Sequence, residues 1–189
     1  ALFFFFFGFT TTGASILRDI EAMSYSMLFW RSFTHWIGGM GVLVFVMAIV
    51  SNMTDRSIHL MRAEMPGPVV GKFVPRGRDT AKILYLIYIV MTLVQTLMLW
   101  AGDMSFFESI VHSFGTAGTG GFGVKANSIA GYSAYSQNVI ATFMLLFGIN
   151  FNLYFLLLIR RPKPVFRSTE LWVYLGIVAV SVAIVTVNI

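Results

Sequence analysis

Residues 104–123 read MSFFESIVHSFGTAGTGGFG, and this stretch decides the fold. Its first part, Met104–Gly115, has the apolarity of a short helix, but about ten to fourteen residues are too few to cross a bilayer. The glycine-rich Gly115–Gly123 follows at once. At membrane depth, irregular backbone is tolerated only where protein buries it or where it lines a wet cavity. A half-length helix that leads into a Gly/Thr loop therefore predicts a re-entrant pore loop.

The composition places the chain in a membrane. Of its 189 residues, 57% are hydrophobic and only 11% are charged, which is outside the range of soluble domains. The sequence has no cysteine, so it offers no disulfide, no thiolate metal site and no cysteine nucleophile. We therefore expect an all-α integral membrane protein that is not an enzyme.

Four stretches have the roughly 20 mostly apolar residues that a spanning helix needs. They are Met27–Val50, Ile83–Ala101, Val139–Ile159 and Leu171–Ile189. The chain starts with alanine, and its first apolar run, Leu2–Phe7, has no basic flank and no cleavage site, which argues against a signal peptide. We expect a fragment whose ends fall inside or next to such elements.

A second pore-loop pattern lies near the start of the chain. Leu2–Ile16 is a short apolar run followed by a Gly/Thr cluster, about 107 positions before the other cluster. We call Phe9–Ser15 the first loop segment and Thr116–Gly123 the second. Each precedes a span that polar or small residues interrupt, namely Gly38, Gly39 and Gly41 in one copy and Gly148 and Asn150 in the other. Two copies of half-helix, loop and span form an internal repeat, which is common in transport proteins.

Basic residues gather on two connections between spans. Ten of the thirteen lie there: Arg56, Arg62, Lys72, Arg76, Arg78, Lys82, Arg160, Arg161, Lys163 and Arg167. Both connections fall on one side, which the positive-inside rule makes cytoplasmic, so the loop segments enter from outside. Cations spread along loop edges at a membrane do not indicate a nucleic-acid partner. The outer flanks are mildly acidic and would attract cations, through Asp19, Glu21, Asp103 and Glu108.

The two loop segments carry the chemistry of a cation filter. Rings of backbone carbonyls can replace the hydration oxygens of a cation, and glycine accepts the conformations that aim successive carbonyls the same way. Threonine adds a hydroxyl that can bind a cation or hold the loop. A single Gly/Thr cluster is most often a surface turn, but two in equivalent positions favour the filter. A phosphate-binding loop is excluded, because no Gly-Lys-Ser/Thr ending follows Gly118–Gly123.

Three histidines and one asparagine leave alternatives open. His35, His59 and His112 include no pair at the i, i+4 spacing that places two imidazoles on one helix face, so structural roles are expected. One alternative function is a membrane-embedded redox protein that binds haem through His35 and His112, and another is a non-conducting assembly subunit. Asn150 is equally consistent with a functional role and with hydrogen bonding between helices.

Five motifs in fixed order resemble one known family. They are Phe9–Ser15 (FTTTGAS), Phe29–Gly41 (FWRSFTHWIGGMG), Met61–Pro68 (MRAEMPGP), Arg78–Tyr85 (RDTAKILY) and His112–Phe122 (HSFGTAGTGGF). Together they closely resemble the Trk/Ktr superfamily of potassium uptake proteins over nearly the whole chain. The resemblance implies potassium transport without an organic cofactor, through a fold of four helix–pore loop–helix repeats around one pathway. It predicts about four spanning helices and two re-entrant pore loops here, as part of that pore domain.

The resemblance also implies how the chain is divided and what it meets. Residues 1–50 would be the end of the first repeat, 51–82 a cytoplasmic basic connection, and 83–160 the second repeat. Residues 161–189 would be a second cytoplasmic connection and the first helix of the third repeat. The implied setting is a bacterial or archaeal plasma membrane, crossed several times. The implied partners are membrane lipid, a second copy in a homodimer and a cytoplasmic, nucleotide-binding, TrkA-like regulatory subunit.

Position in the family's motifs gives the expected potassium-binding filter residues. They are Thr11, Thr12, Gly13, Gly118, Thr119 and Gly120. Two departures stand out: the run Phe3–Phe7 replaces a more mixed, partly acidic pore helix, and glycine stands at 118 and 123 where serine is more usual. We expect these changes to affect selectivity first.

Overall fold

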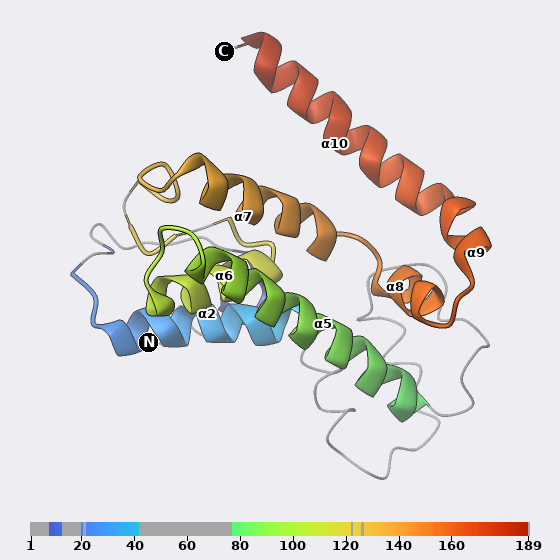
Figure 1. Ribbon diagram of the computed structural model, residues 1–189, viewed down its shortest axis with the longest axis horizontal. Coiled ribbons are helices and arrows are strands. Elements are labelled where there is room, and N and C mark those ends of the chain that lie inside the picture. Colours follow the sequence, from blue (N-terminus) through green and yellow to red (C-terminus); the bar gives the residue numbers. More distant parts are fainter. Residues whose placement is uncertain are drawn as a thin grey trace. The chain divides into compact units, whose positions relative to one another are not determined.

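The computed structural model describes residues 8–12, 20, 22–41, 77–121, 123–125 and 127–188 (Figure 1). Every regular element within these residues is a helix, as the sequence predicts. The chain divides into two compact units, each treated by itself below. The first comprises Ala1–Met65 and Lys72–Gly148, and the second comprises Pro66–Gly71 and Ile149–Ile189. The run Phe3–Phe7, Gly13, His59 and the connection 51–76 lie outside the described residues.

Within the described residues, two helices are long and apolar enough to cross a membrane. Helix α5 covers Gly77–Trp100, with a candidate span over Ala81–Trp100, and helix α10 covers Thr169–Asn188, with a candidate span over Thr169–Val187. Both coincide with stretches that the sequence predicts to span. The second and fourth predicted spans are therefore helices of the expected length.

The predicted half-length helix is also present. Helix α6 covers Phe106–Ala117, 12 residues, and begins with a capping box. The Ser105 hydroxyl accepts the Glu108 N–H at 3.3 Å, and the Glu108 carboxylate accepts the Ser105 N–H at 3.0 Å. These two bonds fix the first turn, and Gly118 caps the other end. The start and the end of α6 are thus set by its own sequence.

The helices that follow the two loop segments are counterparts of each other. Helix α2 covers Tyr25–Gly39, 15 residues, and helix α7 covers Ala134–Phe147, 14 residues; a serine precedes each of them. Both end well before the predicted spans do.

Glycine ends both of these helices early. Gly41 takes a φ of 80° just after α2, and Gly148 caps α7. The interruptions expected within Met27–Val50 and Val139–Ile159 are therefore present, at Gly41 and at Gly148. The residues after Gly41, up to 76, lie outside the described part. By length and composition, α7 and α8 (Phe151–Leu158) together would suffice for one interrupted span.

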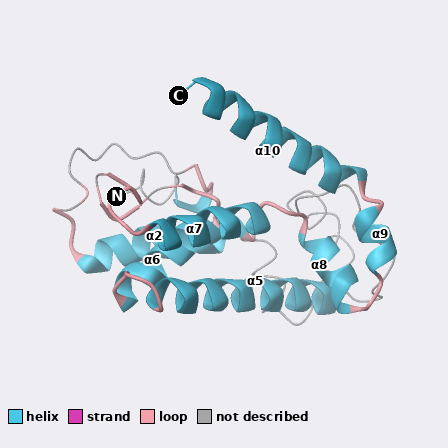
Figure 2. Ribbon diagram, turned by 45° about the horizontal axis from the view of Figure 1, so that its top comes forward, coloured by secondary structure: helices cyan, strands magenta, loops and turns pink. Residues whose placement is uncertain are grey.

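Helix α6 is held on three sides within the first unit. It contacts α2, α5 and α7, as Figures 1 and 2 show. Trp36 is central: its ring stacks on Tyr88 at 5.4 Å and lies 5.4 Å from Phe114. The Trp36 indole N–H donates to the Thr92 hydroxyl at 3.1 Å, and the Tyr88 hydroxyl donates to the Trp36 carbonyl at 2.7 Å. Hydrogen bonds of this kind, about 1 kcal/mol each, lock α2 to α5 beside α6.

The second unit turns a corner between two apolar helices. After α8 come the short helix α9 (Pro162–Phe166) and then α10 (Figure 2). Asn150 caps α8 by accepting the Asn152 N–H at 3.0 Å, and its amide donates to both carboxylate oxygens of Glu170, at 3.2 and 3.0 Å. Of the two roles that the sequence leaves open for Asn150, the structure shows the hydrogen bond between helices.

Candidate functional site

The backbone makes the same unusual turn in both loop segments. Thr11 has a φ of 53° and Thr119 a φ of 54°, in the left-handed region that a β-branched residue rarely adopts. Each threonine N–H donates to the carbonyl three residues earlier, Thr11 to Gly8 at 3.2 Å and Thr119 to Thr116 at 2.8 Å. Such a conformation costs about 1–3 kcal/mol and persists only where the surroundings impose it. Ser128 and Arg160 take the same conformation, but of the four residues only the two threonines are β-branched and lie in the loop segments. The pair therefore marks both loop segments as a candidate functional site.

The two left-handed threonines lie 108 positions apart, close to the offset of about 107 expected between the loop segments. Gly13 lies outside the described residues, so the pairing of Gly13 with Gly120 stays a prediction. Gly121 follows the second turn with a φ of 69°, a conformation that glycine accepts without steric cost.

Hydrogen bonds close the second loop segment onto the end of α6. The Gly120 N–H donates to the Gly115 carbonyl at 2.9 Å, and the Thr119 hydroxyl donates to the Gly118 carbonyl at 2.8 Å. Gly118 itself is the C-cap of α6. The three predicted filter residues of this segment therefore lie together where the helix ends.

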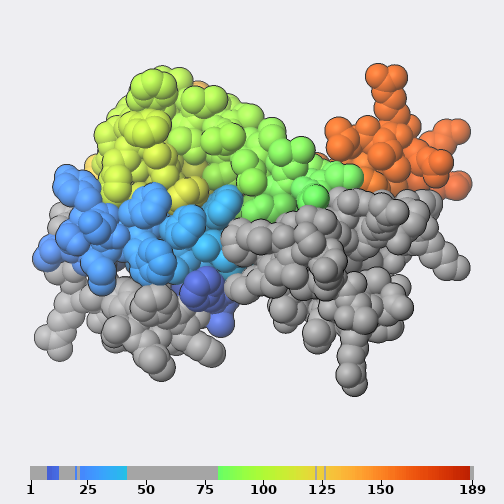
Figure 3. Space-filling model, turned by 90° about the horizontal axis from the view of Figure 1, so that it is seen from below, coloured from blue at the N-terminus to red at the C-terminus, as the bar shows by residue number. Residues whose placement is uncertain are grey.

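Helix α2 contacts both loop segments, although it follows only the first. A methyl group on Gly38 would clash with the Phe9 carbonyl. One on Gly39 would lie 2.7 Å from Cα of Gly118, and the His35 ring also lies against Gly118. In Figure 3, residues 8–12 lie on one side of α2, and α5 and α6 lie on the other. Glycine at 38 and 39 is therefore what allows α2 to approach two loops at once.

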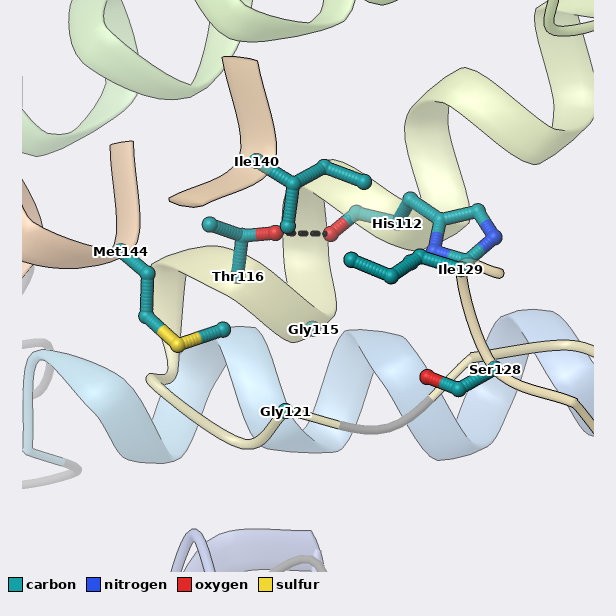
Figure 4. A pocket seen from close by; sticks show the side chains of 8 residues that line it. All are labelled: His112, Gly115, Thr116, Gly121, Ser128, Ile129, Ile140 and Met144. Atoms are coloured by element: carbon teal, nitrogen blue, oxygen red, sulfur yellow. Dashed lines mark hydrogen bonds between the residues drawn. The ribbon is translucent and has the colours of Figure 1, made fainter. Parts of the chain in front are cut away.

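A small cavity lies behind the second loop segment (Figure 4). It has a volume of about 30 Å³, enough for one or two water molecules. Its lining comes from α6, α7 and the loop between them: His112, Gly115, Thr116, Gly121, Ser128, Ile129, Ile140 and Met144. The Thr116 hydroxyl is turned away from the loop and donates to the His112 carbonyl at 2.8 Å.

Asp103 and Glu108, the two outer-flank carboxylates that the structure describes, both bind groups of the same chain. Asp103 accepts the Ser133 N–H and hydroxyl, each at 2.7 Å, and also the Ser136 hydroxyl. Glu108 accepts the Tyr132 hydroxyl at 2.8 Å and lies 3.6 Å from the Lys125 ammonium. These contacts anchor the loop between α6 and α7. The two carboxylates therefore have partners within the chain, which the sequence-based expectation of an acidic outer flank did not include. Asp19 and Glu21 lie outside the described residues.

We expect Asp103→Asn to lower the melting temperature of the full-length protein and to remove one pH dependence. The Ser136 hydroxyl and the Ser133 N–H and hydroxyl lower the pKa of the Asp103 carboxyl from 3.8 to about 2. Because the pKa is lower in the folded state, this stabilisation is present above pH 3.8 and is lost as the pH falls towards 2. Melting curves across that range should slope for the parent and be flatter for Asp103→Asn. Asp103→Glu keeps the charge and serves as control, and equal slopes for the parent and Asp103→Asn would contradict the assignment.

The two histidines of the haem alternative lie in different surroundings. His35, on α2, is in contact with Gly118. His112, on α6, lies edge-on to the Tyr132 ring at 5.3 Å. The six residue steps from His112 to the C-cap Gly118 correspond to about 9 Å along a helix, so the two rings contact different levels of α6 and its C-cap. In the described part of the chain, no group of three or more His, Asp or Glu residues is arranged to hold a metal ion.

Comparison with known proteins gives consistent relatives. The family described as TrkH, cation transport protein, matches residues 1–178. The Trk system potassium uptake protein TrkH of Escherichia coli (strain K12) is 39% identical over 189 residues, which cover 98% of this chain and 39% of that protein. TrkG of the same strain and system is 33% identical over 182 residues, covering 95% of this chain and 37% of that protein.

A solved structure shares the fold. The crystal structure of the potassium transporter TrkH from Vibrio parahaemolyticus matches with a TM-score of 0.71 and 28% identity, over 92% of this chain and 35% of that chain. The predicted membrane fold of helix–pore loop–helix type is thereby confirmed. The chain spans 39% of the length of the curated relative from Escherichia coli. Sequence, fold and relatives agree, and the chain belongs to the TrkH family of cation transport proteins.

Proposed function

We propose that the full-length protein carries potassium across the plasma membrane and that the two loop segments are two parts of its filter. The observation that carries this proposal is the pair of left-handed threonines, Thr11 and Thr119, at equivalent turns. A similar turn in two repeats is compatible with a ring of backbone carbonyl ligands around one axis. Relatives named as potassium uptake proteins support the choice of ion.

The electrostatics of α6 favour a cation at the second loop segment. The helix ends at Ala117, so the negative end of its dipole is directed at Gly118–Gly120. Glu108 in the first turn complements the opposite, positive end. A cation can therefore be stabilised there without a charged side chain in the filter.

The residues assigned to the filter follow from this geometry. We assign potassium ligands to Thr11, Thr12, Gly13, Gly118, Thr119 and Gly120. The proposed assembly is a membrane-embedded homodimer with a cytoplasmic, nucleotide-binding, TrkA-like regulatory subunit. The division into repeats at residues 50, 82 and 160 remains part of the same proposal.

Rubidium uptake by the full-length protein tests the filter directly. In cells that lack their own potassium uptake, we expect Gly120→Asp to abolish uptake, because it places a carboxylate and its bulk among the backbone ligands. Gly131→Asp is the matched control: it makes the same change in an exposed outer loop, where Cβ would meet only the Asn127 side chain. Equal uptake by the parent and by Gly120→Asp, at equal expression, would show that this segment is not the filter.

A further inference from the structure

The corner between α8 and α10 carries a dense group of exposed cations. Four basic side chains fall within eight consecutive residues, and all are exposed: Arg160, Arg161, Lys163 and Arg167. The acidic residue closest to them along the chain is Glu170, and both of its carboxylate oxygens accept the Asn150 amide. Residues 160–170 therefore carry four positive charges against the one negative charge of Glu170.

Large apolar side chains stand beside these cations. Phe166 is 66% exposed and Trp172 is 59% exposed, whereas Val165 is only 5% exposed and anchors α9 to its own unit. The Trp172 indole N–H donates to the Phe166 carbonyl at 2.9 Å, which fixes the corner where α9 meets α10. An open groove of about 520 Å³ lies here, lined by Pro162, Lys163, Phe166 and Arg167. Apolar and cationic groups thus share one surface, which we call the α9 corner.

The place of the α9 corner in the chain puts it at the membrane boundary. It joins the end of apolar α8 to the start of α10, whose candidate span begins at Thr169. The positive-inside rule assigns these cations to the cytoplasmic face. Tryptophan and phenylalanine favour the interfacial layer, and Arg and Lys extend from there to the phosphate level.

We propose that the α9 corner binds the headgroups of anionic phospholipids in the cytoplasmic leaflet, with its arginines and Lys163 on the phosphates and with Phe166 and Trp172 among the acyl chains. Anionic lipid provides both complements, a negative headgroup and an apolar chain, at the depth where the corner lies. A cytoplasmic protein partner would match the cations but would leave the two aromatic side chains in contact with lipid.

Bromine-labelled lipids test this proposal with Trp172 as the reporter. The full-length protein is reconstituted in phosphatidylcholine vesicles that contain a minor fraction of phosphatidylglycerol, with bromine on one lipid or the other. We expect stronger quenching by brominated phosphatidylglycerol than its share of the lipid predicts. The excess should disappear in Trp172→Phe, which identifies the signal among the four tryptophans of the chain.

Charge variants then separate lipid binding from general folding. Each interfacial cation contributes roughly a fivefold preference for anionic lipid, so Arg161→Gln/Lys163→Gln/Arg167→Gln should reduce the preference on the order of a hundredfold, and high salt should weaken it. Arg161→Lys/Arg167→Lys should retain it, as should Lys82→Gln, an exposed cation on another helix. Melting in detergent checks that the triple variant is folded.

Three results would overturn the proposal. The first is equal quenching of the parent by the two brominated lipids. The second is an unchanged preference in the folded triple variant. The third is a triple variant that no longer binds a regulatory subunit but keeps the lipid preference, which would make the α9 corner a protein-binding surface.

Discussion

Gly39→Ala is expected to reduce rubidium uptake by the full-length protein about tenfold or more. The added methyl group would lie 2.7 Å from Cα of Gly118, 2.7 Å from the Tyr88 hydroxyl and 3.0 Å from the Ala117 carbonyl. Two of these three atoms are backbone, so they cannot turn aside as a flexible side chain does. Overpacking of this kind costs about 1–3 kcal/mol, and about 1.4 kcal/mol changes an equilibrium tenfold. The displacement falls on the second loop segment itself.

The control for this change is Gly176→Ala. A methyl group there meets nothing within 4 Å, so the same substitution on α10 should leave uptake at the parental level. Adding Tyr88→Phe to Gly39→Ala relieves the hydroxyl contact but also removes the hydrogen bond to the Trp36 carbonyl, so it should restore little. Parental uptake by Gly39→Ala, measured at equal membrane expression, would mean that α2 does not position the second loop segment.

Thr119→Val is expected to reduce discrimination between potassium and sodium by roughly threefold to tenfold. Valine keeps the branched shape of threonine and the same conformational energy cost at a φ of 54°. It removes only the hydroxyl that donates to the Gly118 carbonyl at 2.8 Å. A net hydrogen bond of about 0.5–1.5 kcal/mol corresponds to a change of this size. Thr11→Val should act in the same direction, because Thr11 makes the same turn in the first loop segment. Rubidium uptake against increasing sodium measures the effect.

Thr119→Ser is the matched control, since it retains the hydroxyl and loses only a methyl group. It should stay near the parent in selectivity. A loss as large as that of Thr119→Val would assign the effect to shape and not to the hydroxyl. Unchanged selectivity in both variants would remove Thr119 from the filter.

Length and hydropathy were sufficient to predict the elements that depend on local sequence. α5 and α10 fall where apolar runs of spanning length occur, and α6 ends where its glycine-rich stretch begins. The glycines that interrupt the first and third predicted spans are visible in the sequence, but hydropathy alone does not show that a helix ends at each place. Asn150 stands out in the sequence as a polar residue inside a predicted span. Its partner Glu170 lies twenty positions away, and only the fold brings the two side chains together.

The loop segments could be located from sequence, but the turn within each could not. Thr10, Thr11 and Thr12 are chemically alike, and only the backbone shows that Thr11 takes the left-handed conformation. Close packing of α2 on the loops is expected from its glycines, but the sequence does not show which loop Gly38, Gly39 and His35 each contact. Their contacts with Phe9 and Gly118 are tertiary, and no pattern within α2 reveals which glycine faces which loop.

The contacts of α2 imply that the repeated sequence unit does not coincide with the set of residues that shapes each loop segment. If each loop segment contacted only helices of its own copy, the two copies could change independently. Gly39 and His35 of the first copy, however, contact Gly118 of the second copy. A chimaera made by joining relatives at the boundary between copies would therefore separate residues that have to match. Designs that exchange the second loop segment should carry α2 along with it.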